Sequence, residues 1–432
     1  MNKKVMALAV AGAFVAPAAA FAQASNVQVF GTMYMEYTPI GNQGQKAPAT
    51  AGGVNSGDFT RIDVLQSPGS EVGIKGEEAL GGGTTAWFQC VSTADIRGAG
   101  TGGGIQGFCG RNSAIGLKGS FGNAYVGNWD MPMKKTAGAA RIVSDTGIWG
   151  AGPMLFGNSS SFNDGASPTV WSRRQNNSIH YDSPVFSGFQ AFASISTPSS
   201  AVGATSNVSG TKPRTWGLAV NYTNGPLLVT AGFEQHQNFN PAAGAVYYNA
   251  VGTVNGTTLA NVGGAAPNAA VGSTDTGWQI GAAYQFGPVK LGALYTKQKY
   301  DFGVQNGVGA DGSVSAWNVA GQWAIVGPHN LRGGYTKANS TSGSYNGGFG
   351  AAPAITPGAL IGNRVFNGGI GATGGNIWQI QYVYNASKRT EMTAGYVRLQ
   401  NDANARYSLG GLSVPNAGSN QDAFAVSIKN TF

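Results

Sequence analysis

Ser178, His180 and Asp182 stand at alternating positions and have the three residue types of a serine-hydrolase triad. Alternate residues of an extended strand share one face and are separated by roughly 6.6–7 Å. A triad needs side-chain contacts near about 3 Å, and the serine side chain is short. The spacing therefore favours polar groups that line a surface, and we do not expect an enzyme.

The segment Gly369–Gly374 matches the GxGxxG spacing of a dinucleotide-binding loop. Such a site needs a strand before the loop and a helix after it. Here an alternating strand pattern follows, beginning near Asn376. We interpret these residues as loop glycines and expect no cofactor. Nucleic-acid binding is not expected either, because the basic residues are dispersed along the chain.

The only two cysteines, Cys90 and Cys109, flank a glycine-rich stretch over 98–104. If that stretch is a hairpin loop, the two sulfurs are cross-strand neighbours and a disulfide is possible in an oxidising compartment. Two unpaired small apolar residues are the alternative. The three histidines are scattered and show no ligand spacing with the cysteines, so the sequence predicts no metal site.

The composition points to one large architecture that must position all of these residues. Charged residues make up 10% of the 432 residues, against roughly 25% in an ordinary soluble domain. Aromatic residues also make up 10%, which argues against disorder, and glycines number 69. No linker of distinct composition divides the chain. This balance fits a barrel with one face in lipid and the other in water.

The first 22 residues have the features of a secretory signal. Lys3 and Lys4 precede an apolar run over 5–22, which Pro17 interrupts and which ends in Ala20-Phe21-Ala22, an A-x-A cleavage site. We expect cleavage after Ala22 and a single domain over 23–432. No later apolar run could span a bilayer as a helix, so an exported membrane protein of this sequence must cross with strands.

Apolar and polar residues alternate in segments of about ten residues, the length of a tilted membrane strand. In the last segment Phe424, Val426 and Ile428 share one face. Short turns alternate with long loops, and counting hairpins gives sixteen strands, with the second over 61–77 and the fourth over 109–118. The pattern predicts an all-β fold, a transmembrane 16-stranded antiparallel β-barrel wide enough for an aqueous channel.

The 44-residue segment 131–174 has no strand pattern and is long for a structureless loop. It carries several large apolar residues, among them Trp149, Phe156 and Trp171. So much apolar surface is unfavourable in water. We expect this third extracellular loop to fold into the lumen and narrow the channel; an external flap is the alternative.

Charged residues that face the channel set its ion preference. Our candidates for the constriction and its selectivity are Arg61, Lys75, Lys118, Arg141, Asp145, Asp164, Arg173 and Arg174, together with Glu36, Asp63, Glu71, Lys134, Lys135 and Asp182. Strand parity places Arg61, Asp63, Glu71 and Lys75 on one face unless a bulge intervenes. Eight basic residues against six acidic ones predict a mild anion preference. For each residue, a solvated position at the rim is the alternative.

Four segments resemble the general diffusion porins of Gram-negative bacteria, in their beta-proteobacterial branch: 70–83, 111–127, 177–192 and 387–396. The terminal Phe432 also resembles the family and implies recognition by the outer-membrane assembly machinery. The resemblance implies a homotrimer of sixteen-stranded barrels in the outer membrane. Asn128 and Tyr34 depart from the family pattern, so the selectivity of the family does not transfer directly.

The expected function is a water-filled channel for passive diffusion of ions and small hydrophilic solutes. Its expected partners are outer-membrane lipid, lipopolysaccharide and two further copies of the chain. Two alternatives remain: a substrate-specific sugar or anion channel, and a surface-binding or adhesive outer-membrane protein whose long neutral loops 237–275 and 338–374 meet other molecules.

Overall fold

The computed structural model describes residues 27–43, 61–98, 104–143, 146–157, 171–196, 214–237, 253–254, 257–258, 274–305, 308–344, 360–361, 364–365, 371–410 and 417–432. The predicted signal over 1–22 and the candidates Asp145 and Asp164 lie outside the described residues.

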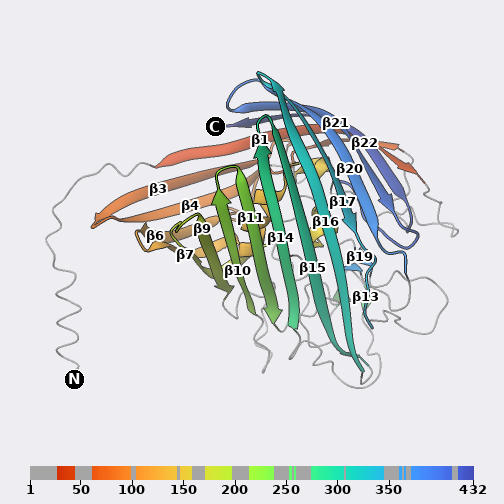
Figure 1. Ribbon diagram of the computed structural model, residues 1–432, viewed down its shortest axis with the longest axis horizontal. Helices are drawn as coiled ribbons and strands as arrows, with labels where there is room; N and C mark the ends of the chain where they lie inside the picture. The colour runs from red at the N-terminus through yellow and green to blue at the C-terminus, as the bar shows by residue number, and fades with distance from the viewer. Residues whose placement is uncertain are drawn as a thin grey trace.

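Antiparallel strands cross the molecule in chain order (Figure 1). They are β1 (Gln28–Gln43), β2 (Arg61–Gln66), β3 (Glu71–Gly81), β4 (Thr84–Asp95), β6 (Ser113–Gly119), β7 (Gly122–Asp130), β8 (Arg174–Asp182), β9 (Phe189–Ser196), β10 (Arg214–Asn224), β11 (Leu227–Gln237), β14 (Thr274–Phe286), β15 (Val289–Gln305), β16 (Val308–Val326), β17 (His329–Ala338), β20 (Gly375–Asn385), β21 (Thr390–Asn401) and β22 (Asn420–Thr431). The shorter elements are β5 (Gly104–Gln106), β12 (Thr253–Val254), β13 (Thr257–Thr258), β18 (Leu360–Ile361), β19 (Arg364–Val365), the helices α2 (Pro132–Ala140) and α3 (Gly152–Phe156), and the 3₁₀ helix η2 (Gly147–Trp149).

The sheet closes on itself because β22 pairs with β1. Since β2 and β3 are two parts of one crossing, the result is the predicted closed 16-stranded antiparallel β-barrel. Three of its short turns repeat one solution: Gly225, Gly287 and Gly327 each have φ +55° and each precedes a proline. A positive φ is inexpensive only for glycine, which explains the repeated sequence.

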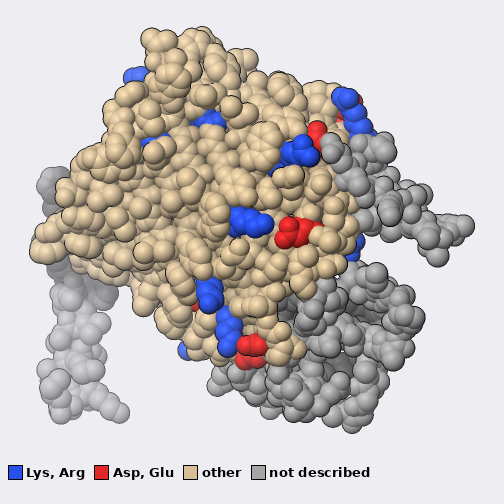
Figure 2. All heavy atoms as spheres, turned by 45° about the vertical axis from the view of Figure 1, so that its right-hand side comes forward, with Lys and Arg blue, Asp and Glu red and all other residues tan. Residues whose placement is uncertain are grey.

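The large apolar side chains that alternate along the strands lie on the exposed face of the sheet. Trp278, Trp378 and Phe424 are 42%, 38% and 51% exposed, as the alternation predicted. Figure 2 shows one side of the molecule, where charged side chains are few and scattered among uncharged residues. A face that carries exposed large apolar side chains and few charges suits contact with lipid.

The second crossing differs from the sequence prediction. β1 pairs with β2 through Glu36 and Gln66, but with β3 through Thr32 and Glu71, so the inward positions change from even to odd numbers. The turn at Pro68 and Gly69 causes the shift. Arg61 and Asp63 consequently lie on the opposite face from Glu71 and Lys75, and the expectation of one shared face was wrong.

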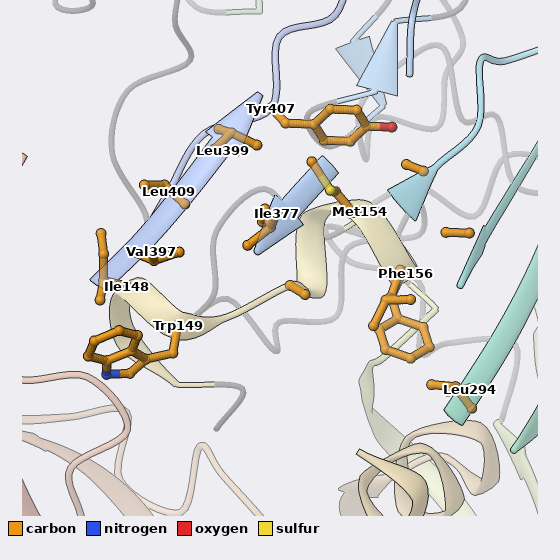
Figure 3. Packing of buried hydrophobic residues seen from close by; sticks show 14 of the residues in the cluster. Ile148, Trp149, Met154, Phe156, Leu294, Ile377, Val397, Leu399, Tyr407 and Leu409 are labelled. Carbon is orange, nitrogen blue, oxygen red and sulfur yellow. The ribbon is translucent and has the colours of Figure 1, made fainter. Parts of the chain in front are cut away.

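In the described part of the chain, no helix is long and apolar enough to cross a membrane. The helices instead pack on the inner face of the sheet, opposite the exposed aromatic residues. Figure 3 shows the resulting core, in which Ile148 and Trp149 of η2 and Met154 and Phe156 of α3 lie beside residues of the strands. All four of these side chains are at most 1% exposed.

Candidate functional site

A buried carboxylate binds the segment 131–157 at the 3₁₀ helix η2. Glu36 of β1 accepts hydrogen bonds from the Ile148 N–H at 2.9 Å and from the Tyr34 hydroxyl at 2.7 Å. Gln66 donates a third through its amide nitrogen at 2.5 Å. Gly147 has φ +69°, and a Cβ added there would lie 2.6 Å from the Glu36 oxygens. Only glycine lets the chain approach this carboxylate so closely.

Further glycines on the inner face make room for this segment and for Trp171, which follows it in the chain. A Cβ at Gly277 of β14 would lie 2.5 Å from the Trp171 ring, and one at Gly281 would lie 2.7 Å from Ala140. Gly334 of β17 faces Val143 in the same way, at 2.9 Å. The absence of a side chain at these glycines allows the close packing, because any larger residue there would push the packed residues away from the strands.

Inward glutamines complete the seat by binding backbone carbonyls of the segment. The amide of Gln279 donates to Met133 O at 2.7 Å, that of Gln298 to Leu155 O at 3.0 Å, and that of Gln379 to Trp149 O at 3.1 Å. These bonds matter because buried carbonyls are costly to leave unpaired. We call the strands that carry the seat, β10, β11, β14–β17, β20 and β21, the covered wall.

Five of the other strands, β3, β4, β6, β7 and β8, carry charged pairs and aromatic rings on their inner face, and we call them the open wall. Lys118 pairs with Glu77 at 2.5 Å, and Arg111 pairs with Glu71 at 2.7 Å. Lys135 of α2 reaches across to Asp182 at 2.5 Å. Burial lowers the pKa of the Lys135 ammonium, while the Asp182 charge acts in the opposite direction.

A closed barrel with a helical segment seated on its inner wall is the architecture of a pore protein. The family model described as Gram-negative porin matches residues 7–404, which is most of the chain. The chain belongs to the Gram-negative porin family. Its place is accordingly the outer membrane, as the sequence predicted.

This porin is 30% identical to "Outer membrane porin protein 32" of Delftia acidovorans over 308 residues, covering 70% of the chain and 72% of the relative. It is 27% identical to "Major outer membrane protein P.IB" of Neisseria gonorrhoeae over 52% of its own length, and the match spans about half (54%) of that relative. Among solved structures, "Anion-selective porin from Comamonas acidovorans" superposes with a TM-score of 0.63 at 19% identity, over 94% of this chain and all (100%) of that one. That likeness shows the same fold.

The predicted basic residues occupy different surroundings in the porin. Lys75 lies over the Phe30 ring at 5.1 Å, and Arg141 over the Phe156 ring at 5.2 Å. Arg174 pairs with Asp130 at 3.3 Å. Arg173 is fully buried, at 0% exposure, and donates to Gln175. It therefore belongs to the protein interior in this structure.

The structure also corrects our distance argument for Ser178 and His180. The Ser178 Oγ lies 2.7 Å from the His180 Nε2, so the two side chains do meet. Asp182 does not complete a triad, because its carboxylate binds Lys135, and the His180 ring instead stacks on Tyr125 with centroids 4.9 Å apart. Membership of a channel family agrees with this arrangement.

The two cysteines form a disulfide with Cα atoms 4.6 Å apart. It joins β4 to the turn before β6, since β6 begins at Ser113 rather than at the predicted residue 109. Cys109 has φ +56°, which is uncommon for a residue other than glycine. The bond ties two neighbours of the open wall together.

Sequence analysis missed a charged group on the inner face of the last strands. Arg332 of β17 and Lys429 of β22 both pair with Glu391 of β21, at 3.3 and 3.4 Å. Lys290 and Arg332 both lie opposite Gln322 of β16 in register. Strand parity, applied to every segment rather than to the first strands alone, would have placed these residues on the inner face of the barrel.

Proposed function

We propose that this porin forms a water-filled channel for passive diffusion of ions and small hydrophilic solutes, and that the segment 131–174 constricts it. The observation that carries the proposal is the seat of glycines and glutamines on the inner face of a closed barrel. A segment held on that face occupies part of the lumen, and the narrowest section of a channel dominates its resistance.

The ion preference follows from charges on or beside the inner face. Five carboxylates, those of Glu71, Glu77, Asp130, Asp182 and Glu391, are paired with seven cations, namely Arg111, Lys118, Lys134, Arg174, Lys135, Arg332 and Lys429. The surplus is positive but small, and most charges are neutralised locally. A mild anion preference is the expected result.

The assembly proposed is a homotrimer in contact with outer-membrane lipid and lipopolysaccharide. One of the structures with the same fold is titled "OmpT (in-vitro folded), an outer membrane protein Vibrio cholerae (trimer form)", at 15% identity and a TM-score of 0.59. The apolar band on the exposed face supplies a surface for neighbouring barrels and for lipid.

Planar-bilayer recording of the purified porin tests the channel. We expect stepwise conductance, and a reversal potential in a KCl gradient that favours chloride slightly. The preference should grow at about 0.01 M salt, where the Debye length of roughly 30 Å lets wall charges act across the lumen. A cation preference would overturn the selectivity, and the absence of any conductance would overturn the channel itself.

A further inference from the structure

Four aromatic rings gather on the inner face of the open wall. Trp87 of β4 and Trp129 of β7 have ring centroids 5.6 Å apart, and each lies within 5.4 Å of Tyr125. The rings of Trp87, Tyr125 and Trp129 meet one another at 56° to 71°, so they form an angled corner rather than a parallel stack. His180 extends the corner by stacking on Tyr125.

A glycine under the corner sets its shape. Gly116 of β6 pairs with Trp87 on one side and with Tyr125 on the other. A Cβ at Gly116 would lie 2.9 Å from the Trp87 indole nitrogen and 2.5 Å from the Tyr125 Cβ. The Trp87 ring thus lies across the glycine and against the wall. Tyr125 is buried, whereas Trp87 and Trp129, whose side chains stand on the same inner face, are only half-buried.

Polar groups surround these rings at hydrogen-bonding positions. Asn123 accepts from the Trp87 indole N–H at 2.7 Å, and the Asn112 amide donates to Asp130, next to Trp129, at 3.0 Å. The Lys135 ammonium lies 5.0 Å from the Tyr125 ring centre. Amide, carboxylate and ammonium groups within reach of an aromatic surface offer both donors and acceptors to a solute that rests on the rings.

This combination matches a pyranose sugar, which presents C–H groups on one face and hydroxyls around its edge. An aromatic surface accommodates the C–H face, and the surrounding polar groups replace water at the hydroxyls. We propose that the Trp87–Trp129 corner is a binding site for a pyranose ring in transit through the channel. The inference rests on the proposed channel and names a class of solute for it.

The position of the corner fits a site on the permeation path. It lies on the open wall, about half-way round the ring of strands from β15 and β17, which carry Lys290 and Arg332. Lys134 and Lys135 of α2 reach the end of β7 and β8 beside it, at Asp130 and Asp182. A solute on the corner would therefore partly fill the passage beside the constriction segment and reduce the ion current.

Ion current through single channels, recorded while sugar is added, tests the site. D-glucose offers a pyranose ring, and the open-chain hexitol sorbitol has nearly the same size without one. We expect glucose to reduce the current in a saturable way and sorbitol to reduce it only in proportion to viscosity. In Trp129→Ala the glucose half-saturation concentration should rise by roughly three- to tenfold.

Matched variants separate binding from channel size. Trp129→Phe should keep most of the glucose effect, because it retains an aromatic face, and Trp378→Ala removes a tryptophan from the exposed face and should change nothing. Equal, non-saturating reductions by glucose and sorbitol in the unmodified porin would overturn the proposal, as would a glucose effect that Trp129→Ala leaves intact. In that case the corner is aromatic packing over a glycine only. Loss of all ion current would instead contradict the channel.

Discussion

The covered and open walls of the barrel use inward residues in opposite ways. On the covered wall, the inward positions that contact the segment 131–157 are small or uncharged, such as Gly281, Gly334 and Gln379. The charged residues Arg332 and Glu391 lie near the ends of β17 and β21, at His329 and Thr390. On the open wall they hold charged pairs and partly exposed aromatic rings, such as Glu71 with Arg111 and Trp87 with Trp129. A polar inward residue is thus no guide to pore lining by itself, because half of the wall is a seat.

The walls also differ in what stabilises them. The covered wall gains a buried core, in which Trp149, Met154 and Phe156 lose nearly all contact with water. The open wall has no helix of the described residues packed along β4 and β6, and there the Cys90–Cys109 disulfide and the aromatic corner tie strands together. Burial of large apolar side chains is worth roughly 1.5–3 kcal/mol each, so the seat contributes substantially to the barrel.

The largest effect is expected at β1, which lies between the two walls, from deletion of Phe432. The backbone of Phe432 exchanges hydrogen bonds of 3.1 and 3.0 Å with Gly31 of β1, and its ring covers Gly31. Without it the last closing pair is lost, and we expect most of the assembled barrel to disappear. Heat-modifiable mobility of outer-membrane fractions measures this, with Phe432→Tyr as the control that keeps the ring and backbone. Unchanged yield in the deletion would show that closure does not depend on this residue.

The sequence predicts the exposed face of the sheet better than the inner face. The exposed face followed from alternation, because lipid contact imposes one rule on every strand and Trp378 or Phe424 obeys it. The change of parity after Arg61 could also have been predicted from the sequence. Ser67-Pro68-Gly69-Ser70 has the composition of a turn and lies inside the predicted strand 61–77. The contacts between the inner face and the segment 131–157 could not be predicted from the sequence. The role of Gly334, for example, depends on its contact with Val143, which is far away in sequence.

A smaller effect is expected from filling the seat, and two adjacent glycines of β17 provide a matched test. Gly334→Leu places a side chain where Val143 lies, whereas Gly333→Leu points to the exposed face, where the nearest atom to an added Cβ is at 3.4 Å. Overpacking should cost about 1–3 kcal/mol and push the segment toward the channel axis. We expect Gly334→Leu to lower both the heat-dissociation temperature and the single-channel conductance.

Gly333→Leu should leave conductance unchanged, because lipid accommodates an extra apolar side chain. If both variants reduce conductance equally, the segment is not seated on the inner face in the membrane. If neither variant reduces conductance, the contact at Gly334 is too weak to hold the segment. The covered wall would then not differ from the open wall in binding the segment.

The smallest change in mean conductance is expected when a single carboxylate is removed, either Glu36 below the segment 131–157 or Glu71 on the open wall. Glu36→Ala leaves the buried Ile148 N–H and the Gln66 amide without their acceptor, at a cost of about 1–3 kcal/mol for each unsatisfied group. The anchor of η2 is then loosened, and we expect more current noise with little change in ion preference. Glu71→Ala removes a partly exposed partner of Arg111, with side chains 30% and 18% exposed, so stability should change by less than about 1 kcal/mol.

The released Arg111 charge should instead shift the reversal potential toward chloride, most clearly at low salt. Current noise and reversal potential recorded on the same channels therefore separate the two carboxylates. Noise without a selectivity shift in Glu36→Ala, and the reverse in Glu71→Ala, would mean that position on the barrel wall decides the role of an acidic residue. The same response in both variants would mean that the charge of the acidic residue alone decides its role. Release of the Arg111 charge and loosening of the segment would then have the same effect on the ion current.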